Sequence, residues 1–107
     1  AVFINFCSSR TGICDHVAPE WRRFREVAHA VLPDVGVAKV DCARDALLCK
    51  ARHIKNFPTL RWYDDRQIQN YHGVLSTLRF VHIAAGNMNR TAAFFEDDAG
   101  KRLVSVN

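Results

Sequence analysis

Cysteine is the residue type in this sequence with the most distinctive chemistry, and its four copies occupy positions 7, 14, 42 and 49. Thiols can form disulfides, exchange them with other proteins, or bind metal ions. The four positions contain no Cys-x-x-Cys pair, and the five histidines are scattered along the chain. A zinc site is therefore not favoured, we expect no metal and no other cofactor, and disulfide chemistry is considered first.

The overall composition is typical of one ordinary globular domain. The chain has 107 residues, of which 49% are hydrophobic and 24% are charged, and this is enough for a single core. The net charge of +4 is spread along the chain without a recognition motif, so no nucleic-acid partner is expected. The apolar runs are all shorter than the ~18 residues that a membrane span needs, and Ala1 does not open a signal-peptide pattern.

Hydrophobic periodicity predicts the elements that position the cysteines. The apolar run Val2–Phe6 predicts a buried strand, and a Ser-rich loop follows it. A helix is predicted from Ile13 or Cys14 up to Pro33, because apolar residues recur there at spacings of three and four. The remaining elements are a strand, a short helix, two hairpin strands and a last helix, at 37–40, 44–52, 59–63, 67–71 and 75–85.

This order, βαβαββα, predicts an α/β domain with a central mixed sheet. The first two strands should be parallel and joined by a right-handed crossover. The last two should be antiparallel, with helices on both faces of the sheet. The order is that of the thioredoxin fold.

Two segments resemble the protein disulfide isomerase family more specifically. Phe6–Trp21 resembles the active-site segment, in which a strand runs into Trp-Cys-Gly-His-Cys and then a helix; the matching residues are Gly12, Cys14, Ala18, Pro19 and Glu20. Asn56–Leu60 resembles the aromatic-Pro-Thr loop of that family. The second resemblance implies a cis proline at Pro58, between Phe57 and Thr59, that faces the active site.

A third segment resembles one subgroup of the isomerases. Val37–Cys42, with Cys49 seven positions later, matches members that carry an additional structural disulfide. The resemblance implies a bridge between Cys42 and Cys49, and such a bridge indicates an oxidising compartment. The tripeptide Asn89-Arg90-Thr91 is a candidate N-glycosylation site and is compatible with the secretory pathway.

The motif that should carry the chemistry departs from the family pattern. Thr11-Gly12-Ile13-Cys14 stands where the family has Cys-Gly-His-Cys. A threonine hydroxyl cannot perform thiol exchange, and no base that could activate it is evident nearby in sequence. We expect Thr11 to cap the helix instead, with its side-chain oxygen accepting a bond from an amide near residue 13 or 14.

Two further positions that assist the chemistry in the family are also changed. Asn5 occupies the place of the buried acidic proton acceptor, and Leu75 or a neighbour replaces an arginine, with Arg79 one helical turn further on. Cys14 is then expected to be a buried small hydrophobe rather than a reactive thiol, with His16 as the one histidine near it. Cys7 is expected to be a core or loop thiol, and a bridge from it to Cys14 is not expected from the fold.

The ends of the chain suggest a division into two parts. Residues 1–88 are predicted to form the thioredoxin-like domain, without the strand and helix that usually precede its first strand. Residues 89–107 are predicted to form an extension, in which Thr91–Glu96 and Arg102–Val106 make a hairpin around a turn at Asp97–Gly100. We expect this hairpin to cover the exposed edge of the sheet; a chain fragment is the alternative.

These observations predict a redox-inactive module rather than an enzyme. It would bind or scaffold a protein or peptide partner, as a chaperone does, in the endoplasmic reticulum or secretory pathway; the candidate contact residues are Ile13, Phe57, Pro58 and Trp62. One alternative is a monothiol oxidoreductase or thiol-retention module that uses Cys14. Another is a structural subunit of a larger, organellar assembly. The sequence leaves the oligomeric state open.

Overall fold

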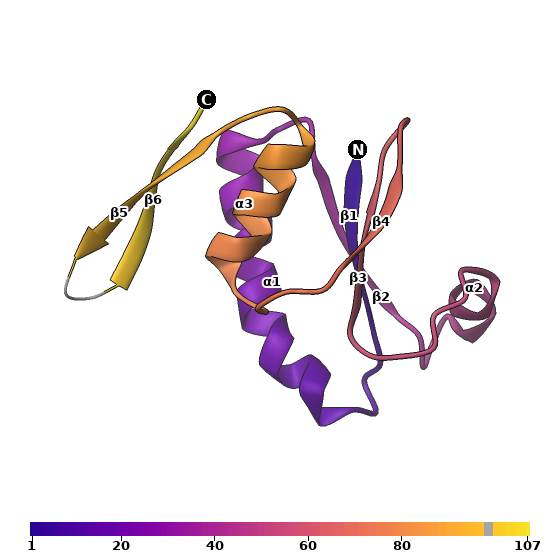
Figure 1. Ribbon diagram of the computed structural model, residues 1–107. Coiled ribbons are helices and arrows are strands. Elements are labelled where there is room, and N and C mark those ends of the chain that lie inside the picture. Colours follow the sequence, from indigo (N-terminus) through magenta and orange to yellow (C-terminus); the bar gives the residue numbers. More distant parts are fainter. Residues whose placement is uncertain (98–99) are drawn as a thin grey trace.

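The computed structural model of the protein describes residues 1–97 and 100–107 (Figure 1). Within these residues it contains three helices and six strands. The bounds in chain order are β1 Val2–Cys7, α1 Gly12–Val31, β2 Gly36–Asp41, α2 Ala46–Ala51, β3 Thr59–Tyr63, β4 Ile68–Tyr71, α3 Thr77–Asn87, β5 Ala92–Asp97 and β6 Gly100–Val106.

The first four strands form one mixed sheet in the order β2-β1-β3-β4. Strand β1 runs parallel to β2, with Phe3 opposite Val37, and antiparallel to β3, with Phe6 opposite Thr59. Strand β4 pairs antiparallel with β3. The α/β class and the thioredoxin topology predicted from the sequence are therefore confirmed.

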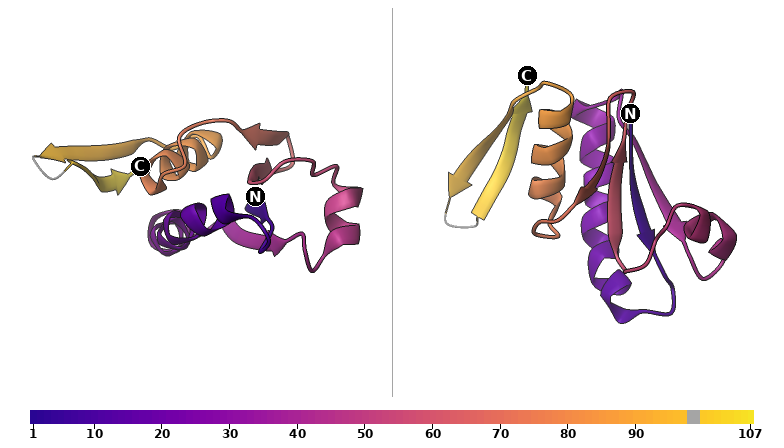
Figure 2. Two further views of the ribbon diagram at one scale, coloured as in Figure 1. Left: turned by 90° about the horizontal axis from the view of Figure 1, so that it is seen from below. Right: turned by 45° about the vertical axis from the view of Figure 1, so that its right-hand side comes forward.

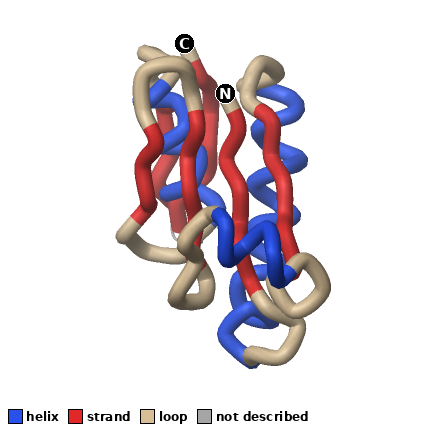
Figure 3. The backbone as a smooth tube through the Cα atoms, turned by 90° about the vertical axis from the view of Figure 1, so that its right-hand side faces the viewer, coloured by secondary structure: helices blue, strands red, loops and turns tan. Residues whose placement is uncertain are grey.

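The helices lie on both faces of this sheet, as predicted. Helices α1 and α3 pack side by side on one face, and the short helix α2 lies on the other (Figure 1, Figure 3). Phe3 of β1 is fully buried between the sheet and the two long helices, and its ring makes edge contacts with Trp21 and Phe24 of α1 at centroid distances of 5.0 and 5.6 Å. This aromatic core fixes α1, and hence its first turn, against β1.

Two local boundaries differ from the sequence prediction. Helix α3 begins at Thr77 rather than Leu75, because Ser76 is its N-cap and accepts a hydrogen bond from the Arg79 amide. Helix α1 begins at Gly12, so Pro19 lies in the helix interior rather than in its first turn. Within the described residues, no helix is both long enough and apolar enough to cross a membrane.

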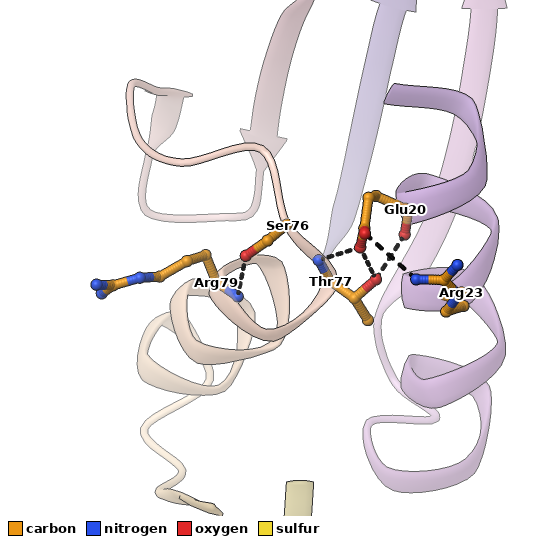
Figure 4. Close-up of polar contacts among 5 residues, drawn as sticks. All are labelled: Glu20, Arg23, Ser76, Thr77 and Arg79. Atoms are coloured by element: carbon orange, nitrogen blue, oxygen red, sulfur yellow. Dashed lines mark hydrogen bonds and ion pairs between the residues drawn. The ribbon is translucent and has the colours of Figure 1, made fainter. Parts of the chain in front are cut away.

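Glu20 and Thr77 tie α1 to α3 (Figure 4). The Thr77 amide donates to Oε2 of Glu20 at 2.8 Å, and the Thr77 hydroxyl donates to the same oxygen. Arg23 forms an ion pair with the other carboxylate oxygen at 3.2 Å. The bonds from Thr77 hold the pKa of Glu20 below its ordinary value. A side chain of α1 thereby satisfies an amide that the start of α3 would otherwise leave unpaired.

The predicted C-terminal hairpin is present, but its predicted location was wrong. Strands β5 and β6 pair antiparallel as a separate two-stranded sheet beside α3, on the side away from the main sheet (Figure 1). Three of its side chains pack against the main core and so hold it there: Ala92, Leu103 and Val106. The predicted turn at Asp97–Gly100 includes residues 98 and 99, which lie outside the described residues. The division of the chain at residue 88 stays a prediction.

Candidate functional site

A disulfide between Cys7 and Cys14 connects the end of β1 to the first turn of α1. The sequence analysis did not expect this bridge and expected Cys14 to be a lone buried thiol, and both expectations were wrong. The physical reason is that the loop of residues 8–11 turns back on itself, so that the two Cα atoms are only 5.8 Å apart. Both side chains are buried, with 5% and 9% of their surfaces exposed.

Thr11 is the N-cap residue of α1, but its side chain does not act as predicted. Its hydroxyl donates to the carbonyl of Ser8 at 3.0 Å and lies 3.0 Å from Sγ of Cys14, to which it also donates. The Ser8 amide donates to the same sulfur at 3.1 Å. Instead of accepting a bond from a helix amide, Thr11 directs its proton toward the sulfur.

The loop before α1 is also held to the end of β2. The carboxylate of Asp41 accepts hydrogen bonds from the amides of Ser9 and Ala43, each at 3.0 Å. The bond from the Ser9 amide is the main cause that holds the pKa of Asp41 below its ordinary value. The loop is therefore fixed at three points: at β1, at α1 and at β2.

Asn5 lies inside the domain, at the position where the family resemblance places an acidic proton acceptor. Only 1% of its surface is exposed, and its Oδ1 accepts no hydrogen bond from the described residues. A carboxamide has no proton-accepting group of suitable basicity, so Asn5 cannot serve a neighbouring thiol as a base.

The register of β1 and β3 brings the proline loop to the same end of the sheet as the disulfide. Phe6 is opposite Thr59, so Pro58 continues toward the position where β1 ends at Cys7. The Phe57–Pro58 peptide bond is cis. Figure 2 shows the start of α1 and the loop before β3 at one end of the molecule.

The register of β3 and β4 adds a third segment to this end. Leu60 is opposite Tyr71, so the chain after β4 passes beside the proline loop. There the Tyr71 hydroxyl donates to the carbonyl of Val74 at 2.6 Å, and the Val74 side chain is 65% exposed. Ile13, which precedes Cys14 on α1, is 42% exposed. We call Ile13, Pro58 and Val74 the docking face.

Cys42 and Cys49, which the family resemblance pairs, are joined by a disulfide with their Cα atoms 5.7 Å apart. This bridge lies on the α2 side of the sheet, in a cluster with the buried ring of Phe6. Phe57 packs against the same cluster, so its ring turns away from α1 and toward α2. The second disulfide therefore supports the proline loop from behind.

The other candidate residues lie outside this site. Trp62 is 1% exposed and belongs to the core, while His16 and Asn89 are exposed on α1 and after α3. The Arg79 side chain extends away from α1 (Figure 4). In the part of the chain that the structure describes, no three His, Cys, Asp or Glu side chains converge as metal ligands would.

Two residues of the site were missed by sequence reasoning. The separation of seven between Cys7 and Cys14 equals that between Cys42 and Cys49, and this equality was a signal that a second bridge could form. Val74 follows Gly73 in the segment before a helix, where an apolar side chain has no periodic partner. That position was a signal of exposure.

Comparison with known proteins identifies the family. The Thioredoxin family model matches residues 1–85, so the chain belongs to the thioredoxin family. More particularly, it is a thioredoxin-like domain of the protein disulfide isomerase and ERdj5 type, as its structural neighbours show.

Three relatives illustrate the similarity. The thioredoxin domain-containing protein 5 homolog of Drosophila melanogaster is 34% identical over 62 residues, which cover 58% of this chain and 15% of that protein. The J-Trx1 fragment of ERdj5 matches with a TM-score of 0.74 and 25% identity, over 82% of this chain and 43% of the fragment. The first two thioredoxin domains of Naumovozyma dairenensis Eps1p match with a TM-score of 0.72 and 25% identity, over 78% of this chain and 33% of that structure. The chain thus spans less than half of each relative.

Proposed function

We propose that this domain binds an extended protein or peptide chain at the docking face and does not perform Cys-x-x-Cys disulfide exchange. The observation that carries the proposal is the state of the helix N-terminus beside the cis proline. There Thr11 replaces the attacking cysteine, and its hydroxyl is engaged with Ser8 and Cys14. What remains exposed at that end is apolar surface.

The chemistry of exchange supports this interpretation. Exchange needs a free thiolate to attack and a second thiol to resolve the mixed disulfide. Cys14 is bonded to Cys7 and Asn5 cannot accept a proton, so neither the attacking group nor the assisting base is in place. The alternative of a monothiol enzyme that uses Cys14 would first require another thiol to open the bridge.

The exposed apolar side chains support the binding role. Ile13 and Val74 lie on opposite sides of Pro58, and both expose large parts of their surfaces. Apolar side chains at a concave junction of loops are typical of surfaces that hold another polypeptide. The alternative of a structural subunit in a larger assembly needs the same surface and differs only in the permanence of the partner.

The proposed location is the endoplasmic reticulum or another part of the secretory pathway. Both disulfides support it, because such bonds form and persist in oxidising compartments. A functional link to ERdj5-type chaperone systems is part of the same proposal.

The experiment is an affinity measurement with an unfolded polypeptide that contains no cysteine, titrated into the unreduced domain. We expect Ile13→Ser and Val74→Ser each to weaken binding by about fivefold, because each removes an apolar contact. Ile68→Ser is the matched control, because Ile68 is 69% exposed on β4 at the end of the strand away from Tyr71. Absence of binding, or an equal loss in the control, would contradict the proposal.

A further inference from the structure

A pocket of about 300 Å³ lies beside the cis-proline loop, between the segment after α2, the start of β3 and the end of β4. Pro58 lines it, so the pocket adjoins the docking face. Four of its lining side chains are cationic or become so near neutral pH. We call these four residues the basic pocket: His53, Lys55, Arg61 and His72.

Arg61 is held in place by uncharged groups. Its Nε donates to Oδ1 of Asn70 at 2.7 Å, and its Nη1 donates to the carbonyl of Arg52 at 2.7 Å. The guanidinium carbon also lies 5.9 Å from the centre of the Phe6 ring. These contacts orient the guanidinium group without neutralising its charge.

The charge of the basic pocket is not compensated by the surrounding protein. None of the described residues that line the pocket is Asp or Glu. No carboxylate of the described residues forms an ion pair with Lys55 or Arg61. A half-buried, oriented guanidinium without an anionic partner is the arrangement that binds a carboxylate from another molecule.

The loop that carries two of the four residues is fixed before any ligand arrives. His53 has a φ of 57° and donates its amide proton to the carbonyl of Lys50 at 3.1 Å. The next amide, of Ile54, donates to the carbonyl of Cys49 at 2.9 Å. Binding would therefore order little additional backbone, and a preformed site loses less entropy on binding.

We propose that the basic pocket binds the carboxylate of an aspartate or glutamate side chain in the polypeptide held at the docking face. This inference rests on the proposed function and adds a sequence preference to it. The bound chain would lay an apolar segment across Pro58 and place an acidic residue a short distance along the chain in the pocket. Lys55 and the two histidines add positive potential around the carboxylate that Arg61 contacts.

The experiment compares matched peptides that contain no cysteine and are acetylated and amidated at their ends. One set carries a single glutamate at successive positions, and the other carries glutamine at the same positions. Affinity for the unreduced domain is measured at low ionic strength, where charge interactions are least screened. The variant is Lys55→Gln, in an exposed loop, and the control is Lys39→Gln, an exposed lysine of β2 outside the pocket.

We expect one glutamate position to bind about tenfold more tightly than its glutamine counterpart, and Lys55→Gln to remove most of that preference. Lys39→Gln should leave it unchanged. Equal affinities for the two sets, or equal effects of the two lysine variants, would overturn the pocket while leaving the docking face intact. A preference seen only with a free C-terminal carboxylate would overturn the assignment to a side chain. Absence of binding by every peptide would overturn the proposed function itself.

Discussion

The hydroxyl group of Thr11 donates a hydrogen bond to Sγ of Cys14 across 3.0 Å. The Ser8 amide donates to the same sulfur, and the atom lies in the first turn of a long helix. Each of these features stabilises negative charge on sulfur. They would make Cys14 a good leaving group if an external thiolate attacked Cys7 and broke the bridge.

We therefore predict that the Cys7–Cys14 bond is reduced before the Cys42–Cys49 bond. Both bridges close loops with the same separation of seven residues, so the loop-closure entropy does not distinguish them. Their surroundings do, because Cys42 and Cys49 lie in an apolar cluster that disfavours a thiolate. Equilibration in glutathione buffers of graded ratio, followed by alkylation and mass mapping of each cysteine, measures the order.

The contribution of Thr11 to this order is tested separately. Thr11→Val removes the hydroxyl and keeps the side-chain shape, whereas Thr11→Ser keeps the hydroxyl. The valine variant should make reduction of the Cys7–Cys14 bond less favourable by up to about tenfold, the size expected for one hydrogen bond to a charged group. Identical behaviour of the two variants would show that the hydroxyl plays no part.

A second prediction concerns the lost exchange activity. The combination Cys7→Ser with Thr11→Cys frees Cys14 and restores a Cys-x-x-Cys pair at the start of α1. We expect this double variant to reduce insulin disulfides with a dithiol as electron source, and the natural chain and Cys7→Ser alone to do so at the uncatalysed rate. Activity of the natural chain would contradict the proposed absence of exchange.

The third prediction concerns acid stability. The folded-state pKa of Glu20 is below its ordinary value of 4.5, so its contribution to stability is present above that pH and is lost as the pH falls through the folded-state pKa. Glu20→Gln should lower the free energy of unfolding by about 1 kcal/mol at neutral pH. The difference from the natural chain should disappear at about pH 3, as denaturant titrations at both pH values would show. Glu26→Gln, at an exposed position of the same helix, is the control.

The fourth prediction concerns the C-terminal hairpin. Leu103 is half-buried and packs against the main core. Leu103→Ala should therefore lower the free energy of unfolding by about 1 to 2 kcal/mol, less than at a fully buried leucine. Ile68→Ala, at an exposed apolar position, should have almost no effect. A hairpin that does not pack on α3 would give no loss in either variant.

The fold was predictable from the sequence because its signals are local. Apolar periodicity defined the long helix, and the apolar run at Val2–Phe6 defined the strand that became the centre of the sheet. The boundaries at Gly12 and Thr77 were less predictable, because they depend on capping bonds within loops.

The site was predictable only where a single residue type carried the information. Thr11 cannot be a thiol in any structure, so its consequence followed from the sequence alone. The partner of Cys7 depended on how tightly the intervening loop turns, and that turn is set by tertiary bonds to Asp41 and to the sulfur itself. The position of the hairpin depended in the same way on long-range packing against α3.

The most direct test of the central claim is a ¹⁵N NMR titration of the unreduced domain with an unfolded polypeptide that contains no cysteine. Binding at the docking face predicts shift changes at the amides of Ile13, Thr59 and Val74, with no mixed disulfide formed and the Ile68 amide unchanged. No shift changes, or changes confined to residues distant from Pro58, would contradict the account.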